Sequence, residues 1–168
     1  DEQQNKRKMD TQKIRMMGAD LVNKKTVAEK LSRDFFNKMP RSLVQFARFL
    51  LEFLETNFHI NRGVIYRVDN KRWVPLVAKA PQNFVPPRHI LDQVWENKEA
   101  RRFSMTEVDD QNDVSRSIIE NKVVSAICFP LFHNDVMQGV LYIDTLDEKE
   151  TLTQDDLLLL AALIPGIE

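Results

Sequence analysis

The chain has 168 residues, of which 43% are hydrophobic and 29% charged, as is typical of one globular domain with an additional element. Its 24 basic and 25 acidic residues leave a formal net charge of -1, so no field of one sign predicts a nucleic acid or an anionic membrane as partner. The longest apolar run, 157–164, is far shorter than the roughly 18 residues that indicate a membrane span, and no signal-peptide pattern opens the chain. One cysteine cannot form an internal disulfide, which agrees with a reducing compartment. We therefore expect a cytoplasmic protein, or a cytoplasmic part of a larger one, without membrane insertion.

The N-terminal region combines a polar segment with a predicted helix. Residues 1–13 are charged and amide-rich without apolar periodicity, so we expect them to be disordered or frayed. In residues 14–38, seam positions recur at alternating spacings of three and four, and all of them are apolar except Lys24. This pattern is typical of a coiled-coil signalling helix. Because an isolated helix of this length is marginal in water, the stripe is expected to pack either against a second copy in a parallel coil or back onto its own domain. The residues predicted to form the dimer interface are Ile14, Met17, Leu21, Ala28, Leu31 and Phe35.

A second helix is predicted over residues 43–54. Ser42 and Gln45 offer a capping box at its start, and its apolar residues form a wide face. Phe49 and Leu51 lie off that face, which leaves part of the helix available to a partner.

The first hairpin is predicted directly after this helix. Two runs with strand composition, 63–68 and 72–79, flank the polar turn Asp69-Asn70-Lys71. Such a pattern favours two antiparallel strands joined by a short loop.

The next segment, 80–124, has a different character. Its prolines prevent regular structure up to His89, where a short helix is predicted. A strand over 101–106 and another short helix over 114–121 follow, separated by an acidic loop. Loops of this length on a rigid sheet are frequent sites of binding.

The C-terminal part is predicted as a hairpin followed by a helix. Two apolar runs flank the turn His133-Asn134-Asp135, which is strand chemistry around a short loop. Thr153 and Asp156 then form a capping box. The helix that they start is expected to end near Ile164, because Pro165 lacks an N–H and clashes with the preceding turn.

These residues also resemble a known family. The order Ser125-x-x-Cys-x-Pro-Leu, turn, Gly139-Val-Leu-Tyr-x-Asp, then Thr153-x-x-Asp-Leu is similar to the C-terminal half of GAF domains, which are small-molecule-sensing and dimerising modules of signalling proteins. The helix over 43–54 followed by 61–69 resembles the opening helix and first strand of the same family. Together the two blocks span roughly 125 residues, a domain-like length.

The resemblance implies an α+β GAF domain over residues 40–168. It implies an antiparallel sheet of about six strands with helices on one face, preceded by the signalling helix. In that architecture the segment 80–124 roofs one face of the sheet and encloses the ligand pocket. The pocket residues that follow from this are Phe84, His89, Trp95, Arg101, Met105 and Arg116.

Residues that carry chemistry in other proteins have ordinary interpretations here. Cys128 lies in an apolar strand and is interpreted as a small packed hydrophobe, not as a nucleophile or a bilin attachment point. The three histidines are scattered, without a second ligand at metal spacing, so no metal site is expected. His89 leaves a haem open as the weaker alternative to a solvated histidine. The four glycines form no phosphate-binding loop.

A cyclic nucleotide ligand is not favoured. Many GAF domains bind one through Asn-Lys and a later Phe-x-x-x-Asp-Glu, whereas the matching places here hold Asp144-Thr145 and 151–156, so that only Asp155 and Asp156 are retained as acids. No cofactor is therefore expected, and a small-molecule ligand of unknown class stays open. An anionic ligand would find guanidinium partners, although solvated surface arginines are the simpler interpretation; the candidates are Arg88, Arg101, Arg102 and Arg116.

The resemblance implies a regulatory role and no enzymatic activity of the domain itself. We expect a homodimeric sensor that binds a small molecule between sheet and roof and controls an attached output domain, such as a nucleotide cyclase. The alternative is a GAF domain without ligand that serves only for dimerisation. A relative that reduces methionine sulfoxide would need several reactive cysteines, whereas this chain has one.

Overall fold

The computed structural model describes residues 43–104 and 122–164, together with Glu29. The chain divides into two units, residues 1–39 and 40–168, and the elements below belong to the second. The six predicted dimer-interface residues lie outside the described residues. The same holds for Ser42 of the predicted capping pair and for the predicted helix over 114–121.

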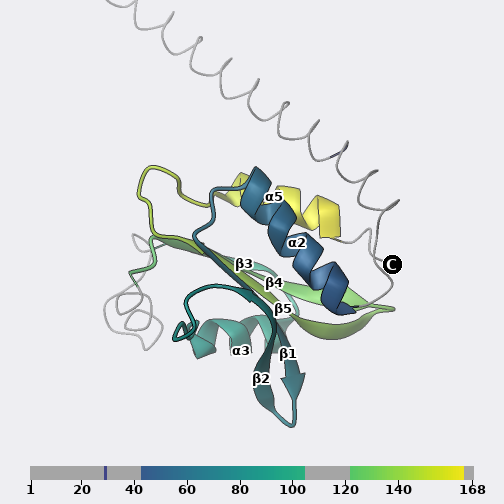
Figure 1. The fold of residues 1–168 in the computed structure, drawn as a ribbon. Coiled ribbons are helices and arrows are strands. Elements are labelled where there is room, and N and C mark those ends of the chain that lie inside the picture. Colours follow the sequence, from purple (N-terminus) through teal and green to yellow (C-terminus); the bar gives the residue numbers. More distant parts are fainter. Residues whose placement is uncertain (1–28, 30–42, 105–121, 165–168) are drawn as a thin grey trace, which may run out of the picture. The chain divides into compact units, whose positions relative to one another are not determined.

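The described part of the chain contains an antiparallel sheet of five strands in the order β2-β1-β5-β4-β3 (Figure 1). This confirms the α+β antiparallel fold that the sequence predicts. The strands are β1 Arg62–Asp69, β2 Arg72–Lys79, β3 Arg101–Ser104, β4 Ser125–His133 and β5 Val136–Thr145.

Within residues 43–104 and 122–164, three helices cover the two faces of this sheet. Figure 1 shows α2 (Leu43–Asn57) and α5 (Gln154–Leu163) side by side on one face, and α3 (Arg88–Asn97) on the other. The sequence predicts helices on one face, whereas the structure has them on both. Both faces are covered because the central strands are apolar on both sides: all residues from Val140 to Ile143 are buried, a pattern typical of strands between two layers.

Each hairpin is closed by two residues with left-handed backbone. The φ angles are 48° and 61° at Asn70 and Lys71, and 48° and 60° at Asn134 and Asp135. Positive φ at both central positions is characteristic of the type I′ turn, whose twist matches that of the flanking strands. The two polar turns predicted from the sequence are therefore hairpin turns.

Two glycines allow parts of the domain to approach closely. A Cβ atom on Gly139 would lie 2.2 Å from the carbonyl oxygen of Tyr66 on the neighbouring strand, and a Cβ atom on Gly63 would lie 3.0 Å from Cδ2 of Leu51. Leu51 is fully buried, so the expectation that it lies available to a partner is wrong. It packs in the space that the missing side chain of Gly63 leaves on β1.

The start of α5 is fixed by the predicted capping box. The Thr153 hydroxyl accepts a hydrogen bond from the Asp156 amide at 3.2 Å, and the Asp156 carboxylate accepts one from the Thr153 amide at 2.8 Å. The helix ends at Leu163 with Ile164 as its C-cap, at the position that the sequence predicts. Pro165 lies outside the described residues.

Candidate functional site

A buried ion pair joins two neighbouring strands at one end of the sheet. Arg62 on β1 and Asp144 on β5 are cross-strand partners. The Arg62 Nε lies 3.0 Å from both carboxylate oxygens, and Nη2 lies 2.6 Å from Oδ2. The side chain of Asp144 is 0% exposed and that of Arg62 is 11% exposed. Such charge-assisted contacts compensate a carboxylate for the loss of water.

Tyr142 completes the surroundings of this carboxylate. Its hydroxyl donates a hydrogen bond of 2.9 Å to Asp144 Oδ2. Burial raises the pKa of the Asp144 carboxyl, while the hydrogen bonds and charge of Arg62 and the Tyr142 hydroxyl act in the opposite direction. Burial, followed by the negative charge of Asp144, raises the pKa of Tyr142, so this phenol stays a hydrogen-bond donor at neutral pH.

Phe84 covers the guanidinium of Arg62. The Arg62 Cζ lies 4.1 Å from the centroid of the Phe84 ring, within the range of a cation–π contact. The same ring lies 5.8 Å from that of Tyr142. A turn, in which the Phe84 amide donates to the carbonyl of Pro81 at 2.9 Å, places the ring there. The loop between β2 and α3 thus closes over the ion pair.

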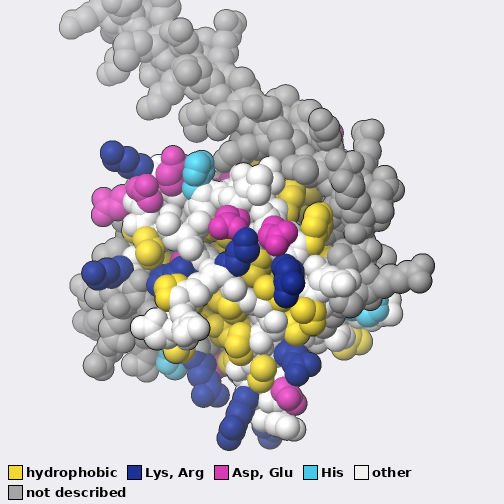
Figure 2. Space-filling model, viewed as in Figure 1, with side chains coloured by type: hydrophobic (Ala, Val, Ile, Leu, Met, Phe, Trp, Pro, Cys, Tyr) yellow, Lys and Arg dark blue, Asp and Glu magenta, His cyan; other side chains and the backbone are white. Residues whose placement is uncertain are grey.

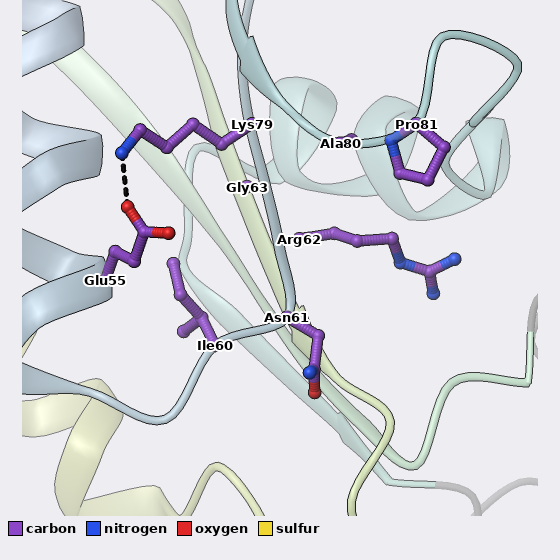
Figure 3. A pocket seen from close by; sticks show the side chains of 8 residues that line it. All are labelled: Glu55, Ile60, Asn61, Arg62, Gly63, Lys79, Ala80 and Pro81. Carbon is purple, nitrogen blue, oxygen red and sulfur yellow. Dashed lines mark hydrogen bonds and ion pairs between the residues drawn. The ribbon is translucent and has the colours of Figure 1, made fainter.

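A cavity of about 460 Å³ lies beside Arg62, where α2 ends, β1 begins and β2 ends. Figure 3 shows Glu55 of α2 and Lys79 of β2 pointing toward each other on one side of it, with Arg62 and Pro81 on the other. Glu55 and Lys79 form an ion pair. The residues that line the cavity are Glu55, Ile60, Asn61, Arg62, Gly63, Lys79, Ala80 and Pro81.

An aromatic group joins β2 to α3. The Trp73 Nε1 donates a hydrogen bond of 2.8 Å to the Asp92 carboxylate. The Trp73 ring meets the Trp95 ring edge to face at 5.6 Å, and that of Tyr66 at 6.4 Å. Edge-to-face contacts of this kind are favourable, so the group helps to hold α3 on the sheet.

Four of the six residues predicted for the roof pocket lie in the described part of the chain. Phe84 and Trp95 are half-buried and pack against the core cluster beneath α3. His89 is exposed. Arg101 is exposed and donates a hydrogen bond of 3.4 Å to Gln93 of α3. Met105 and Arg116 lie outside the described residues.

Arg62 and Asp144 are not among the site residues that the sequence predicts. The available signal was a charged residue directly before an apolar strand, and a second one that ends the run Gly139-Val-Leu-Tyr-Ile-Asp. A charge at a strand end is ordinarily solvated. Only the pairing of β1 with β5 shows that these two face each other.

Nucleophile and metal chemistry have no support in the described residues. Cys128 is fully buried on β4, and burial raises the pKa of its thiol well above the usual range, as expected of a thiol that packs as a small hydrophobe. Among residues 43–104 and 122–164, no group of three His, Cys, Asp or Glu side chains could hold a metal ion.

Within the same part of the chain, no helix is long and apolar enough to span a membrane.

The surface charge is mixed on the face that Figure 2 shows. Basic side chains gather around the tip of the β1–β2 hairpin, and acidic ones lie toward the opposite end, with hydrophobic side chains between them. Arg67, Lys71 and Arg72 are exposed at the hairpin, next to the exposed Asp69. No field of one sign marks this face for a polyanion.

Comparison with solved structures shows what this arrangement resembles. The chain is similar to the GAF domain of a two-component sensor histidine kinase from Bacillus halodurans, with 18% identity, a TM-score of 0.52, and coverage of 74% of this chain and 90% of that one. It is similar to a GAF sensor protein from Burkholderia vietnamiensis, with 15% identity, a TM-score of 0.63, and coverage of 89% and 86%. The chain has a GAF-like fold.

An enzyme shares this GAF-like fold. The free methionine-R-sulfoxide reductase from Neisseria meningitidis, solved with its substrate, is 18% identical, with a TM-score of 0.67 over 89% of this chain and 88% of that one. No family model matches the sequence, and no curated protein matches it. At these identities the likeness shows the fold alone, so the role of this GAF-like domain has to be argued from its own residues.

Proposed function

We propose that this GAF-like domain is the regulatory input of a cytoplasmic signalling protein and binds a small molecule in the cavity beside Arg62. The observation that carries the proposal is the contact between a ligand-sized cavity and the residue that holds the buried Asp144. A volume of about 460 Å³ falls within the range of small-molecule sites. A molecule that contacts the Arg62 stem can change how β1 is held to β5.

We further propose that the domain is not itself an enzyme. Reduction of a sulfoxide by thiols oxidises two sulfurs to a disulfide, whereas this chain has one cysteine. That cysteine is buried, with a pKa that disfavours the reactive thiolate. The buried Asp144 has Arg62 and Tyr142 as partners, which suits a structural carboxylate better than an acid or base in contact with substrate.

The signal would leave through a homodimer and an attached output domain, such as a nucleotide cyclase. The heptad pattern over 14–38 supports the dimer. Apolar residues exposed on the two neighbouring helices support a continuation of the interface, since Val44 on α2 is 43% exposed and Leu158 on α5 is 59% exposed.

A specific observation also favours the second candidate function, a domain that only dimerises. Phe84 and Trp95 pack against the core cluster on the α3 face. The space in which the resemblance places a ligand is therefore occupied, at these two positions, by the chain's own side chains. In this case the cavity beside Arg62 would bind nothing.

Melting of the purified chain with and without metabolites distinguishes the two candidates. A ligand at 100 times its dissociation constant adds about 2.7 kcal/mol to the free energy of unfolding, or roughly 5 to 10 °C in melting temperature for a domain of this size. Ala80→Phe should abolish the shift, because Ala80 lines the cavity. Ala78→Phe is the matched control, since Ala78 is exposed on β2, two residues before Ala80, and does not line the cavity. The absence of any shift, together with no bound molecule in native mass spectrometry, would favour the domain that only dimerises.

A further inference from the structure

We infer that the cavity beside Arg62 takes a compact zwitterion of the amino-acid type, with the ligand carboxylate on Lys79 and the ligand ammonium on Glu55. The inference rests on the proposed function and names the class of ligand. It comes from the charges that a molecule in this cavity can reach.

The cavity offers a ligand one accessible positive group and one accessible negative group. Glu55 and Lys79 point toward each other at its wall (Figure 3), and their side chains are 55% and 37% exposed. Arg62 also lines the cavity, but its guanidinium is directed to Asp144 and covered by Phe84. The charge of Arg62 is therefore balanced inside the domain and does not call for an anion.

The Glu55–Lys79 pair can be exchanged for a ligand at small cost. Ion pairs between exposed side chains contribute little, because water solvates the separated charges almost as well. A zwitterion that lies between the two side chains gives each of them a new partner of opposite charge. Neither Glu55 nor Lys79 is then left without a partner.

Other ligand classes fit the lining less well. A nucleotide carries several negative charges, whereas among the described residues that line the cavity Lys79 is the only cation that a ligand can reach. A wholly apolar ligand would leave the Glu55–Lys79 pair in place, but it would displace water from these two charged groups without offering them a hydrogen bond in return. Apart from Asn61, the remaining wall offers the apolar residues Ile60, Ala80 and Pro81, which suit a small ligand side chain.

Binding of this kind would act on the join between a helix and the sheet. Glu55 belongs to the last turns of α2, and Lys79 is the last residue of β2. A ligand between them would replace the direct Glu55–Lys79 ion pair by a contact through the ligand. It would thus change how α2 is held on β2, the edge strand. Because α2 follows the predicted signalling helix in the chain, the site is positioned to bias it.

The experiment is isothermal titration of the full chain with each protein amino acid at millimolar concentration. The best binder is then compared with its amide, which lacks the carboxylate, and with its N-acetyl form, which lacks the ammonium. We expect both derivatives to bind at least about tenfold more weakly, a loss of about 1.4 kcal/mol each.

Two variants assign each ligand charge to its protein partner. Lys79→Met should weaken the binding of the amino acid but not the binding of its amide. Glu55→Gln should weaken the binding of the amino acid but not the binding of its N-acetyl form. Arg88→Gln is the matched control, since Arg88 forms an exposed ion pair with Asp92 on α3, away from the cavity, and should leave all affinities unchanged.

Three results would overturn the inference. These are equal binding of the derivatives, binding that is indifferent to both variants, and the absence of binding by any amino acid. If a molecule of another class shifts the melting temperature and Ala80→Phe removes that shift, the proposed function stands and only the ligand class is wrong. If nothing binds, both fail.

Discussion

Arg62 and Asp144 lie 82 positions apart in the sequence, yet the guanidinium of one holds the fully buried carboxylate of the other across β1 and β5. The ion pair thus joins β1 and β5, which are neighbours in the sheet but far apart in the sequence. The pair is enclosed by the Tyr142 hydroxyl and the Phe84 ring. Its contribution to stability is therefore that of a buried pair, not of a surface pair.

Removing one member of the Arg62–Asp144 pair should lower the free energy of unfolding far more than removing both members. Arg62→Met leaves Asp144 buried without its cation, and we expect a loss of about 3 to 5 kcal/mol in the free energy of unfolding. The double variant Arg62→Met with Asp144→Leu should recover most of that loss, because no buried charge remains. Urea denaturation measures both. A double variant as unstable as the single one would show that shape, and not charge, decides stability at this position.

The pH dependence of stability should reveal the raised pKa of Asp144. Burial raises this pKa above its usual value of 3.8, so between the two values the folded state holds a proton that the unfolded state has lost. The contribution of this group to the free energy of unfolding is therefore largest below pH 3.8 and falls as pH rises through the folded-state pKa. Asp144→Asn has no such proton. We expect the stability difference, wild type minus variant, to decrease with rising pH in urea titrations, and a difference that increases would contradict the raised pKa.

Gly139 should tolerate no side chain. A Cβ atom there would lie 2.2 Å from the Tyr66 carbonyl oxygen, and backbone on a paired strand cannot move aside. We expect Gly139→Ala to lower the free energy of unfolding by about 3 kcal/mol or more. Gly63→Ala is the matched control, since its Cβ would meet the flexible Leu51 side chain at 3.0 Å and should cost about 1 kcal/mol. Similar losses for the two, measured by thermal melting, would count against the close approach of β5 to β1.

The sequence predicts those features whose chemistry lies within a few residues. The Thr153–Asp156 capping box and the turns around Asn70 and Asn134 are confirmed, because local hydrogen bonds and φ preferences decide them. The buried charge of Asp144 could not be predicted in this way, since it depends on the pairing of β5 with β1. The burial of Leu51 likewise depends on the absence of a side chain at Gly63, which no helical periodicity can show.

Glycine in the hairpin turns should stabilise the domain. Lys71 and Asp135 occupy the left-handed region with φ of 61° and 60°, where a Cβ atom costs roughly 1 to 2 kcal/mol. Because glycine loses more chain entropy on folding, we expect Lys71→Gly to raise the free energy of unfolding by about 0.5 to 1 kcal/mol. Asp135→Gly should raise it by less, because aspartate tolerates this conformation better than lysine does. Asn70→Gly is the control, since asparagine tolerates this conformation, and should change little. A loss of stability in both variants would indicate that the side chains themselves contribute.

The predicted dimer should depend on the N-terminal seam. Replacing Leu21 and Leu31 together by Glu would place like charges in an apolar interface, and we expect light scattering to show monomers for the variant and dimers for the unaltered chain at roughly tens of micromolar. Leu158→Glu tests the contribution of α5 independently of the N-terminal seam, since Leu158 is 59% exposed on that helix. If the interface continues over α5, Leu158→Glu should weaken the dimer in the same assay, and it should melt like the unaltered chain at concentrations where both are monomeric. If the unaltered chain is monomeric at this concentration, the apolar stripe over 14–38 must pack on its own domain, and the signal would have to pass within a single chain.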